Sequence, residues 1–298
     1  MSRKFYTLDV FTKTALAGNP LAVVLESEGL SDYAMQMIAK EFNLSETVFL
    51  FPPQDPSNRA SLRIFTPATE LPFAGHPTVG TAVLIALLDG QASSVFGWEE
   101  KVGLVACTAS RVSDSAGEAI FTLPRLPERI ADAAPSSMIA EALGVPADEI
   151  GFDEHHPIVA SAGVGFNFVP LKSKDAVTRA SIKGANWTEA FEAAGRPNAF
   201  IYTRETAERD HHFHARMFAP HLGIGEDPAT GGAAAAFARA FVDFEHPQDG
   251  THRIVIEQGY AMGRPSQITL EMDVKGRALT NARIGGSAVI VSEGKINL

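Results

Sequence analysis

The stretch ELPFAGHPTVGTAVLIALL, residues 70–88, places a short turn rich in glycine and proline directly before an apolar run of helical length. The turn carries a carboxylate and a histidine, so titratable groups stand where the chain enters a core. A similar junction, EDPATGGAAAAFARAFV, follows at residues 226–242. Two such junctions predict two related halves of the chain that hold a small molecule between them.

An internal repeat supports this division. RIFTP at residues 63–67 matches RMFAP at residues 216–220, an offset of 153 positions (216 − 63). Each copy is followed by an acid, proline, alanine and glycine, and then by a hydrophobic helix. Coincidence of common residues is the alternative, but the neighbouring elements recur in the same order, which favours a duplicated domain. The proline-containing segment near residues 125–137 predicts the boundary, giving units 1–127 plus 281–298 and 128–280.

The bulk composition limits the class of protein. The 298 residues are 45% hydrophobic, enough for a sizeable core, and the net charge of −10 argues against a general nucleic-acid binder. The single cysteine, Cys107, excludes a disulfide within the chain and favours a reducing compartment. No apolar leader or run of membrane-spanning length is recognisable, so we expect a cytoplasmic protein without a membrane contact.

Both helix starts have the chemistry of an anion site. The first N–H groups of a helix lack intrahelical partners, the helix dipole adds positive charge, and glycine allows close approach. The residues concerned are Gly75 and His76 in one half, and Thr230, Gly231 and Gly232 in the other. Tight packing of a helix on a sheet explains a single junction equally well, whereas the matched pair favours a site for a carboxylate or a developing anion.

Glu46 stands in LSETVFLF, which is predicted to be a strand. In a strand, Glu46 shares its face with Val48 and Leu50. An apolar face favours the neutral carboxylic acid, as in a base that takes a proton from carbon and returns it. Taken alone, a glutamate at a strand end with its carboxylate in water is the better interpretation.

Histidine and aspartate occupy equivalent places beside a proline at the two helix starts. Asp227 is expected to be an N-terminal cap, and His76 either caps, packs or carries protons. Glu70 and Glu226 are expected to be surface acids that complement the helix dipoles.

Two other chemically interesting residue types receive simpler interpretations. In DHHFHARMF, His212 and His214 share one strand face, which we expect to be solvated because no further ligand cluster completes a metal site. Cys107 is expected to be a small buried hydrophobe.

Five segments together resemble one known family. FTKTALAGNPLAVVL, LSETVFL, RIFTPATELPFAGHPTVGTA, RMFAPHLGIGEDPATGGAA and EQGYAMGRPSQI are similar, in order, to the phenazine-biosynthesis PhzF-like family over about residues 5–292. The resemblance implies the α+β fold of diaminopimelate epimerase, in which each lobe is a curved, mostly antiparallel sheet around a central helix. The central helices would span about 77–88 and 232–243, with the site in a cleft at their N-termini. The C-terminal strand would return to the first lobe.

The resemblance also implies an activity, a cofactor-free isomerisation in which a glutamate moves a proton between carbons of a small cyclic amino-hydroxy acid. The family's catalytic residues map onto Glu46, His76 and Asp227. The substrate-binding residues would be Asn19, Gly75, Pro77, Thr230, Gly231 and Gly232. The implied partners are a small carboxylate substrate and a second copy of the chain in a homodimer, without a cofactor or metal.

One position departs from the family pattern, which commonly reads DPATGS where this chain has DPATGG with Gly232. A hydroxyl donor is therefore missing, which argues against the family's best-known substrate and leaves the substrate of this chain open. The alternative function is a non-catalytic protein that binds a small ligand or a partner on the same fold. A metal-dependent hydrolase that uses the histidine row is a third hypothesis.

Overall fold

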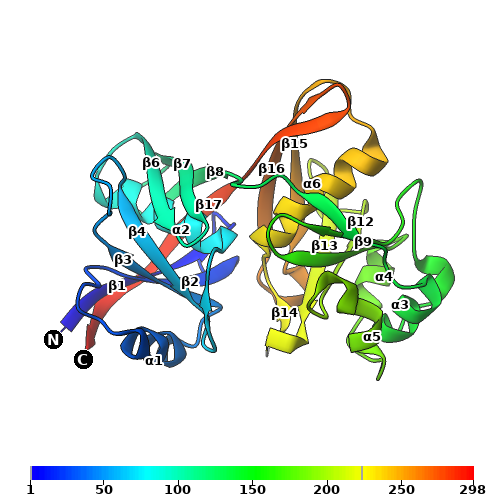
Figure 1. The fold of residues 1–298 in the computed structure, drawn as a ribbon, viewed down its shortest axis with the longest axis horizontal. Helices are drawn as coiled ribbons and strands as arrows, with labels where there is room; N and C mark the ends of the chain where they lie inside the picture. Colours follow the sequence, from blue (N-terminus) through cyan, green and yellow to red (C-terminus); the bar gives the residue numbers. More distant parts are fainter. Residues whose placement is uncertain (1, 223) are drawn as a thin grey trace. The chain divides into compact units, whose positions relative to one another are not determined.

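The computed structural model describes residues 2–222 and 224–298, and the chain divides into two compact units. Unit 1 comprises Met1–Pro124 and Ile284–Leu298, and unit 2 comprises Arg125–Arg283 (Figure 1). The expected divisions after residues 127 and 280 therefore lie three residues from those of the structure. Among the described residues, no helix combines the length and apolar character needed to cross a membrane.

Unit 1 is a ring of strands around one helix. Its strands are β1 (Ser2–Val10), β2 (Asn19–Val24), β3 (Glu46–Phe51), β4 (Ala60–Phe65), β5 (Glu70–Leu71), β6 (Ser93–Glu100), β7 (Gly103–Arg111) and β8 (Ala116–Thr122). Strand β17 (Ala278–Asn297) returns beside β1, as expected for the C-terminal strand (Figure 1). The pairings run β17–β1–β2–β3–β4–β6–β7–β8 and back to β17. The β2–β3 and β4–β6 pairs are parallel, whereas β17–β1, β1–β2, β3–β4, β6–β7 and β7–β8 are antiparallel.

Helix α2 (Gly75–Leu88) is the centre of this ring, and twelve of its fourteen residues are buried. Such a helix can be apolar on all sides because strands surround it. It packs closely: a Cβ added at Gly80 would lie 2.6 Å from Leu21 Cδ2 and 2.7 Å from Val10 Cγ2. The sheet therefore holds the N-terminus of α2 at a fixed place beside β2.

Helix α1 (Asp32–Phe42) covers the sheet with one apolar face, as its sequence predicts. The Ser31 hydroxyl accepts the Ala34 N–H at 3.2 Å, and Met35, Ile38 and Ala39 are buried. The helix ends at Asn43, which adopts a left-handed conformation.

Unit 2 repeats this plan with additional helices. Its strands are β9 (Glu128–Ala131), β10 (Ile158–Ser161), β11 (Gly165–Pro170), β12 (Ala199–Thr203), β13 (Phe213–Ala219), β14 (Ile224–Asp227), β15 (Gly250–Gln258) and β16 (Ser266–Lys275). Its α-helices are α3 (Ser136–Leu143), α4 (Lys174–Arg179), α5 (Trp187–Phe191) and α6 (Gly231–Glu245). Short 3-10 turns cover Ala147–Glu149, Glu192–Ala194, Pro220–Leu222 and Tyr260–Met262.

Helix α6 is the central helix of unit 2. The ring of Phe237 packs edge-on against Tyr202 at 4.9 Å and Phe213 at 5.0 Å between centroids, so strands β12 and β13 lie on it. Strands β11–β12 and β13–β15 are parallel, whereas β9–β10, β10–β11, β12–β13 and β15–β16 are antiparallel. The expected central helices at 77–88 and 232–243 thus begin one or two residues earlier than predicted.

The two R-x-F-x-P motifs serve the same purpose in both units, and one expectation about their neighbours is wrong. Arg63 binds Glu70 through two hydrogen bonds of 2.8 and 2.7 Å, and Arg216 binds Glu226 through two of 2.9 and 2.8 Å. Both glutamate side chains are only 16% exposed, so they are partners of arginine and not surface acids. A bidentate pair fixes the loop before each central helix to the preceding strand.

Candidate active site

In unit 1, the structure brings Glu46 and His76 together. Glu46 is the first residue of β3 and lies opposite Leu21 of β2 in a parallel pairing. His76 is the second residue of α2. Glu46 Oε2 lies 3.1 Å from His76 Nε2, and the two side chains are 14% and 5% exposed. The carboxylate is thus nearly enclosed and touches the imidazole, unlike a solvated strand-end glutamate.

His76 is a neutral imidazole at physiological pH. Burial lowers its pKa to about 3, although a hydrogen bond to the backbone of Pro20 works in the opposite direction. Proline has no backbone N–H, so its carbonyl accepts this bond from the imidazole. Because Nε2 faces Glu46, Nδ1–H is the donor to Pro20, and the Nε2 lone pair points towards the carboxyl group.

The other residues expected at this junction lie on the same elements. Asn19 begins β2 directly before Pro20 and is fully buried. Gly75 and Pro77 flank His76 in the first turn of α2, and both are buried. The N-cap residue, Ala74, makes no side-chain capping bond. The first turn of α2 is thus a helix start without a capping side chain, built beside Glu46.

In unit 2, Asp227 is the last residue of β14, three residues before the N-cap of α6. The expected role of Asp227 as the cap is therefore wrong: Thr230 is the N-cap residue, and it makes no side-chain capping bond. The Thr230 hydroxyl instead donates to Asp227 Oδ2 at 2.5 Å. This bond orients the Asp227 carboxylate relative to the helix start.

Gln258, the last residue of β15, is the functional candidate that sequence reasoning missed. Its Oε1 accepts the Thr230 N–H at 3.0 Å, so any backbone anion site at this helix start rests on Gly231 and Gly232. The signal was present in the family-like segment EQGYAMGRPSQI, but nothing local in that segment indicates the partner at position 230.

Gly232 is not required by packing. A Cβ added there would lie 3.4 Å from Cζ and 3.6 Å from Cε2 of Phe166, which is a tight but ordinary contact. The glycine that replaces the family's usual serine therefore changes the chemistry of the helix start more than its packing.

His212 is exposed, as expected, whereas His214 of the same row is buried, so the expected solvated face is wrong for His214. His214 is 5% exposed, and its Nδ1 lies 2.9 Å from Glu257, while His211 Nδ1 lies 2.7 Å from the same carboxylate. Burial works to raise the pKa of Glu257, but hydrogen bonds from His214, the Ala207 and Glu208 backbone and His211 outweigh it and lower the pKa to about 2. Among residues 2–222 and 224–298, no group of three or more His, Cys, Asp or Glu could hold a metal ion.

Cys107 is buried, as expected, with 2% of its surface exposed.

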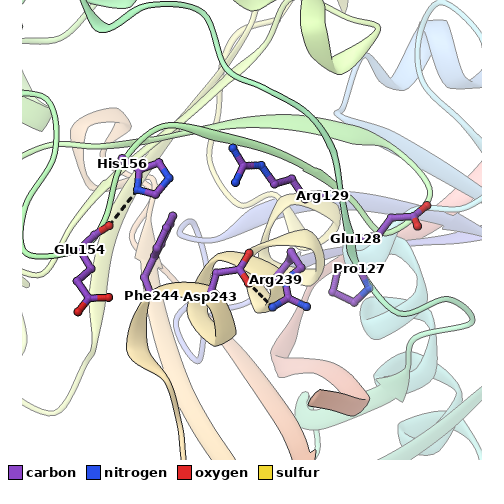
Figure 2. Close-up of a pocket in the computed structure, with 8 residues that line it drawn as sticks. All are labelled: Pro127, Glu128, Arg129, Glu154, His156, Arg239, Asp243 and Phe244. Atoms are coloured by element: carbon purple, nitrogen blue, oxygen red, sulfur yellow. Dashed lines mark hydrogen bonds and ion pairs between the residues drawn. The ribbon is translucent and has the colours of Figure 1, made fainter. Parts of the chain in front are cut away.

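A separate hollow of about 660 Å³ lies within unit 2 and contains none of the expected site residues (Figure 2). Its walls are Pro127, Glu128, Arg129, Glu154, His156, Arg239, Asp243 and Phe244. Figure 2 shows His156 beside Phe244, with ring centroids 4.7 Å apart, and Arg239 paired with Asp243. The Arg239–Asp243 ion pair and the His156–Phe244 ring contact thus line this hollow, apart from the residues expected to form the site.

The chain is similar to known proteins over nearly its whole length. The family described as phenazine biosynthesis-like protein matches residues 8–294. An uncharacterized isomerase of Mesorhizobium japonicum is 46% identical over 99% of both chains. Trans-2,3-dihydro-3-hydroxyanthranilate isomerase of Pseudomonas fluorescens is 31% identical, also over 99% of both chains. A Bacillus anthracis protein of the PhzF family superposes with a TM-score of 0.86 over the full length of both chains, at 24% identity.

These matches define the class, an isomerase of α+β fold, and confirm the fold expected from the sequence. The chain belongs to the phenazine biosynthesis-like, or PhzF, family.

Proposed function

We propose that this chain is a cofactor-independent isomerase or epimerase that moves a proton between carbons of a small carboxylate-bearing amino or hydroxy substrate. The observation that carries the proposal is the enclosed contact between Glu46 Oε2 and His76 Nε2 at 3.1 Å. A carboxylate in such surroundings is suited to take up and release one proton, which is the task of an acid–base catalyst.

The proton transfer assigned to Glu46 has two steps. Its carboxylate removes a proton from a substrate carbon, and the electrons of the C–H bond move into the adjacent conjugated system. The resulting carboxylic acid then gives the proton to another carbon, or to the opposite face of the same carbon. The substrate is neither oxidised nor reduced overall, so the reaction needs no redox partner.

His76 holds the acid form of Glu46 between these steps. The low pKa of His76 keeps the imidazole neutral, and the Pro20 carbonyl takes its N–H. The Nε2 lone pair is then an acceptor for the proton on Glu46. This hydrogen bond would keep the carboxyl group oriented while it carries the proton, without a second positive charge in the site.

The helix starts are proposed to bind the substrate's charged groups. Gly75 of α2, and Gly231 and Gly232 of α6, supply backbone N–H groups at positive helix ends that suit a carboxylate. Asp227, oriented by Thr230, is the proposed anchor for an amine or hydroxyl group. Asn19 and Pro77 complete the proposed substrate contacts.

Deuterium uptake tests this function. Trans-2,3-dihydro-3-hydroxyanthranilate, L-proline and trans-4-hydroxy-L-proline are incubated in D₂O with the protein, and carbon-bound deuterium is measured by mass spectrometry. We expect exchange of at least one compound with the wild type and a loss of about 10³-fold or more with Glu46→Gln, because general acid–base catalysis contributes about 10²–10⁴-fold.

The matched control is Glu41→Gln, the same chemical change on an exposed position of α1, which should exchange like the wild type. Full exchange in Glu46→Gln would refute the proposed base. Binding of these compounds, seen as a thermal shift, without exchange by the wild type would favour the non-catalytic alternative.

A further inference from the structure

Gln258 lies at the end of β15 and is fully buried. Its amide uses three hydrogen bonds on one turn of unit 2. Nε2 donates to the Asp227 carbonyl at 2.7 Å and to Thr230 Oγ1 at 3.0 Å, and Oε1 accepts the Thr230 N–H at 3.0 Å. A single side chain therefore ties both ends of the 227–230 turn to one strand.

The partners fix which end of the amide is nitrogen. The Asp227 carbonyl can only accept and the Thr230 N–H can only donate, so Nε2 must face the carbonyl and Oε1 the N–H. The other Nε2 hydrogen occupies a lone pair of the Thr230 hydroxyl. That hydroxyl must then direct its own hydrogen elsewhere, and it points at Asp227 Oδ2, 2.5 Å away.

The backbone beside Gln258 is shaped for this contact. Gly259 has a positive φ of 79°, and a Cβ there would lie 2.6 Å from the Pro228 carbonyl oxygen and 2.4 Å from that of Arg264. Only glycine allows the strand end and the turn to approach so closely. The segments EQG and DPAT are thus in direct contact, although Thr230 and Gln258 are 28 positions apart in the chain.

We propose that Gln258 is a positioning residue: its amide sets the direction of the Thr230 hydroxyl, and through it the orientation in which the Asp227 carboxylate meets the substrate. Gln258 itself need not touch the substrate. The three hydrogen bonds of Gln258 to the 227–230 turn, called the clamp below, belong to unit 2 alone. Only the expected effect of the clamp on catalysis rests on the proposed function.

The test combines kinetics with amide hydrogen exchange of Gln258→Glu, Gln258→Met and Gln267→Glu. The first variant keeps the shape but loses the Nε2 donors, and the second removes all three bonds at similar volume, which covers the case in which a buried charge prevents folding. The third is the matched control, since Gln267 is exposed on the adjacent strand β16, opposite Glu257.

We expect kcat for deuterium exchange of the test compound that the wild type turns over fastest to fall about 10- to 100-fold in both Gln258 variants, because small misplacements of a reacting group cost about that much. KM should stay within about threefold. Gln258→Glu should regain part of its kcat as the pH is lowered, because protonation of the introduced carboxyl group restores a donor. Gln258→Met should not, and Gln267→Glu should match the wild type.

Hydrogen exchange distinguishes a failure of the Gln258 clamp from a failure of the proposed function. The peptide that contains the Thr230 amide should exchange at least 10-fold faster in Gln258→Met than in Gln267→Glu, because methionine removes the acceptor of the Thr230 N–H. Gln258→Glu keeps an acceptor oxygen at this place and should exchange more slowly than Gln258→Met. Unchanged exchange would overturn the clamp, whatever the wild type catalyses. Faster exchange with unchanged kcat would overturn the positioning role. A wild type that turns over none of the three test compounds, with the clamp intact, would count against the proposed function and not against the clamp.

Discussion

Strands β6 and β15 occupy the same place in the two units, and their last two residues can be compared directly. Each runs parallel to the strand that carries the R-x-F-x-P motif, with Ser61 opposite Glu99 in unit 1 and His214 opposite Glu257 in unit 2. Glu99 and Glu257 each accept two backbone N–H groups from a loop. Glu99 accepts those of Gln54 and Asp55, and Glu257 accepts those of Ala207 and Glu208. The loop positions differ by 153, the offset of the sequence repeat (207 − 54).

The last residue of the strand differs between the units: it is Glu100 in β6 and Gln258 in β15. Glu100 interacts with the hydroxyl of Thr78 in the first turn of α2 at 2.9 Å, and burial raises its pKa to about 8 against the effect of that hydrogen bond. Gln258 makes three hydrogen bonds to the turn before α6. An amide offers two hydrogens and an acceptor at every pH, whereas a carboxyl group donates only when protonated. The duplicated scaffold is therefore titratable at this position in unit 1 and not in unit 2.

The largest expected effect concerns Glu257 and its counterpart in unit 1, Glu99. Glu257→Gln should reduce the free energy of unfolding by about 3–5 kcal/mol at pH 7, because it removes a fully buried charge from four N–H partners. Glu99→Gln should cost much less, since its loop partners are exposed. Urea unfolding of both variants makes the comparison. Equal losses in the free energy of unfolding would show that Glu99 and Glu257 stabilise their loops equally.

The same acid also predicts acid sensitivity. The pKa of Glu257 is lowered from about 4.5 to about 2 in the folded chain, so its stabilisation is complete above the unfolded value and is lost as the pH falls towards 2. The wild type should therefore lose more stability than Glu257→Gln on acidification through this range.

An effect of opposite sign in pH is expected for Glu100. Its folded pKa of about 8 exceeds the unfolded value of 4.5, so between these values the folded chain binds a proton that the unfolded chain has lost. The free energy of unfolding then falls as the pH rises, by at most about 1.4 kcal/mol per pH unit. Glu100→Gln should flatten this slope between about pH 5 and 8.

Urea unfolding at several pH values measures this slope, and Glu99→Gln is the control that should retain it. If the wild type and Glu100→Gln had the same slope, Glu100 would not titrate in this range, and it would not differ from Gln258 in this respect.

The smallest expected effect concerns Gly232. Gly232→Ser should change the free energy of unfolding by no more than about 0.5 kcal/mol, because the new Cβ meets only the edge of Phe166. Gly80→Ala, in the central helix of unit 1, should cost about 1–3 kcal/mol because its Cβ would overlap Leu21 and Val10. Thermal unfolding compares the two, and a large loss in Gly232→Ser would mean that packing, and not substrate chemistry, requires the glycine.

Much of the fold follows from local sequence. Ser31 and the apolar spacing after it predict α1, and the glycine-containing starts at residues 75–77 and 230–232 predict the central helices. These signals are readable because caps and periodicity act within a few residues. The repeat also predicted the duplication, but not that its arginines bind Glu70 and Glu226.

The missed contacts share one property, which is that their partners are distant in sequence. Glu257 lies 43 positions from His214, and Gln258 lies 28 from Thr230. Polar side chains such as these are usually solvated, so without the fold a surface position is the natural expectation for both.

The sequence by itself determined the order of the motifs, the two helix starts and the residues that can carry a proton, because residue type and spacing suffice for these. The tertiary structure alone decided that His76 is neutral, that its Nε2 faces Glu46, and that the Thr230 N–H binds Gln258. Protonation and hydrogen-bond direction depend on burial and on the nearest partner, and strands far apart in the chain set both.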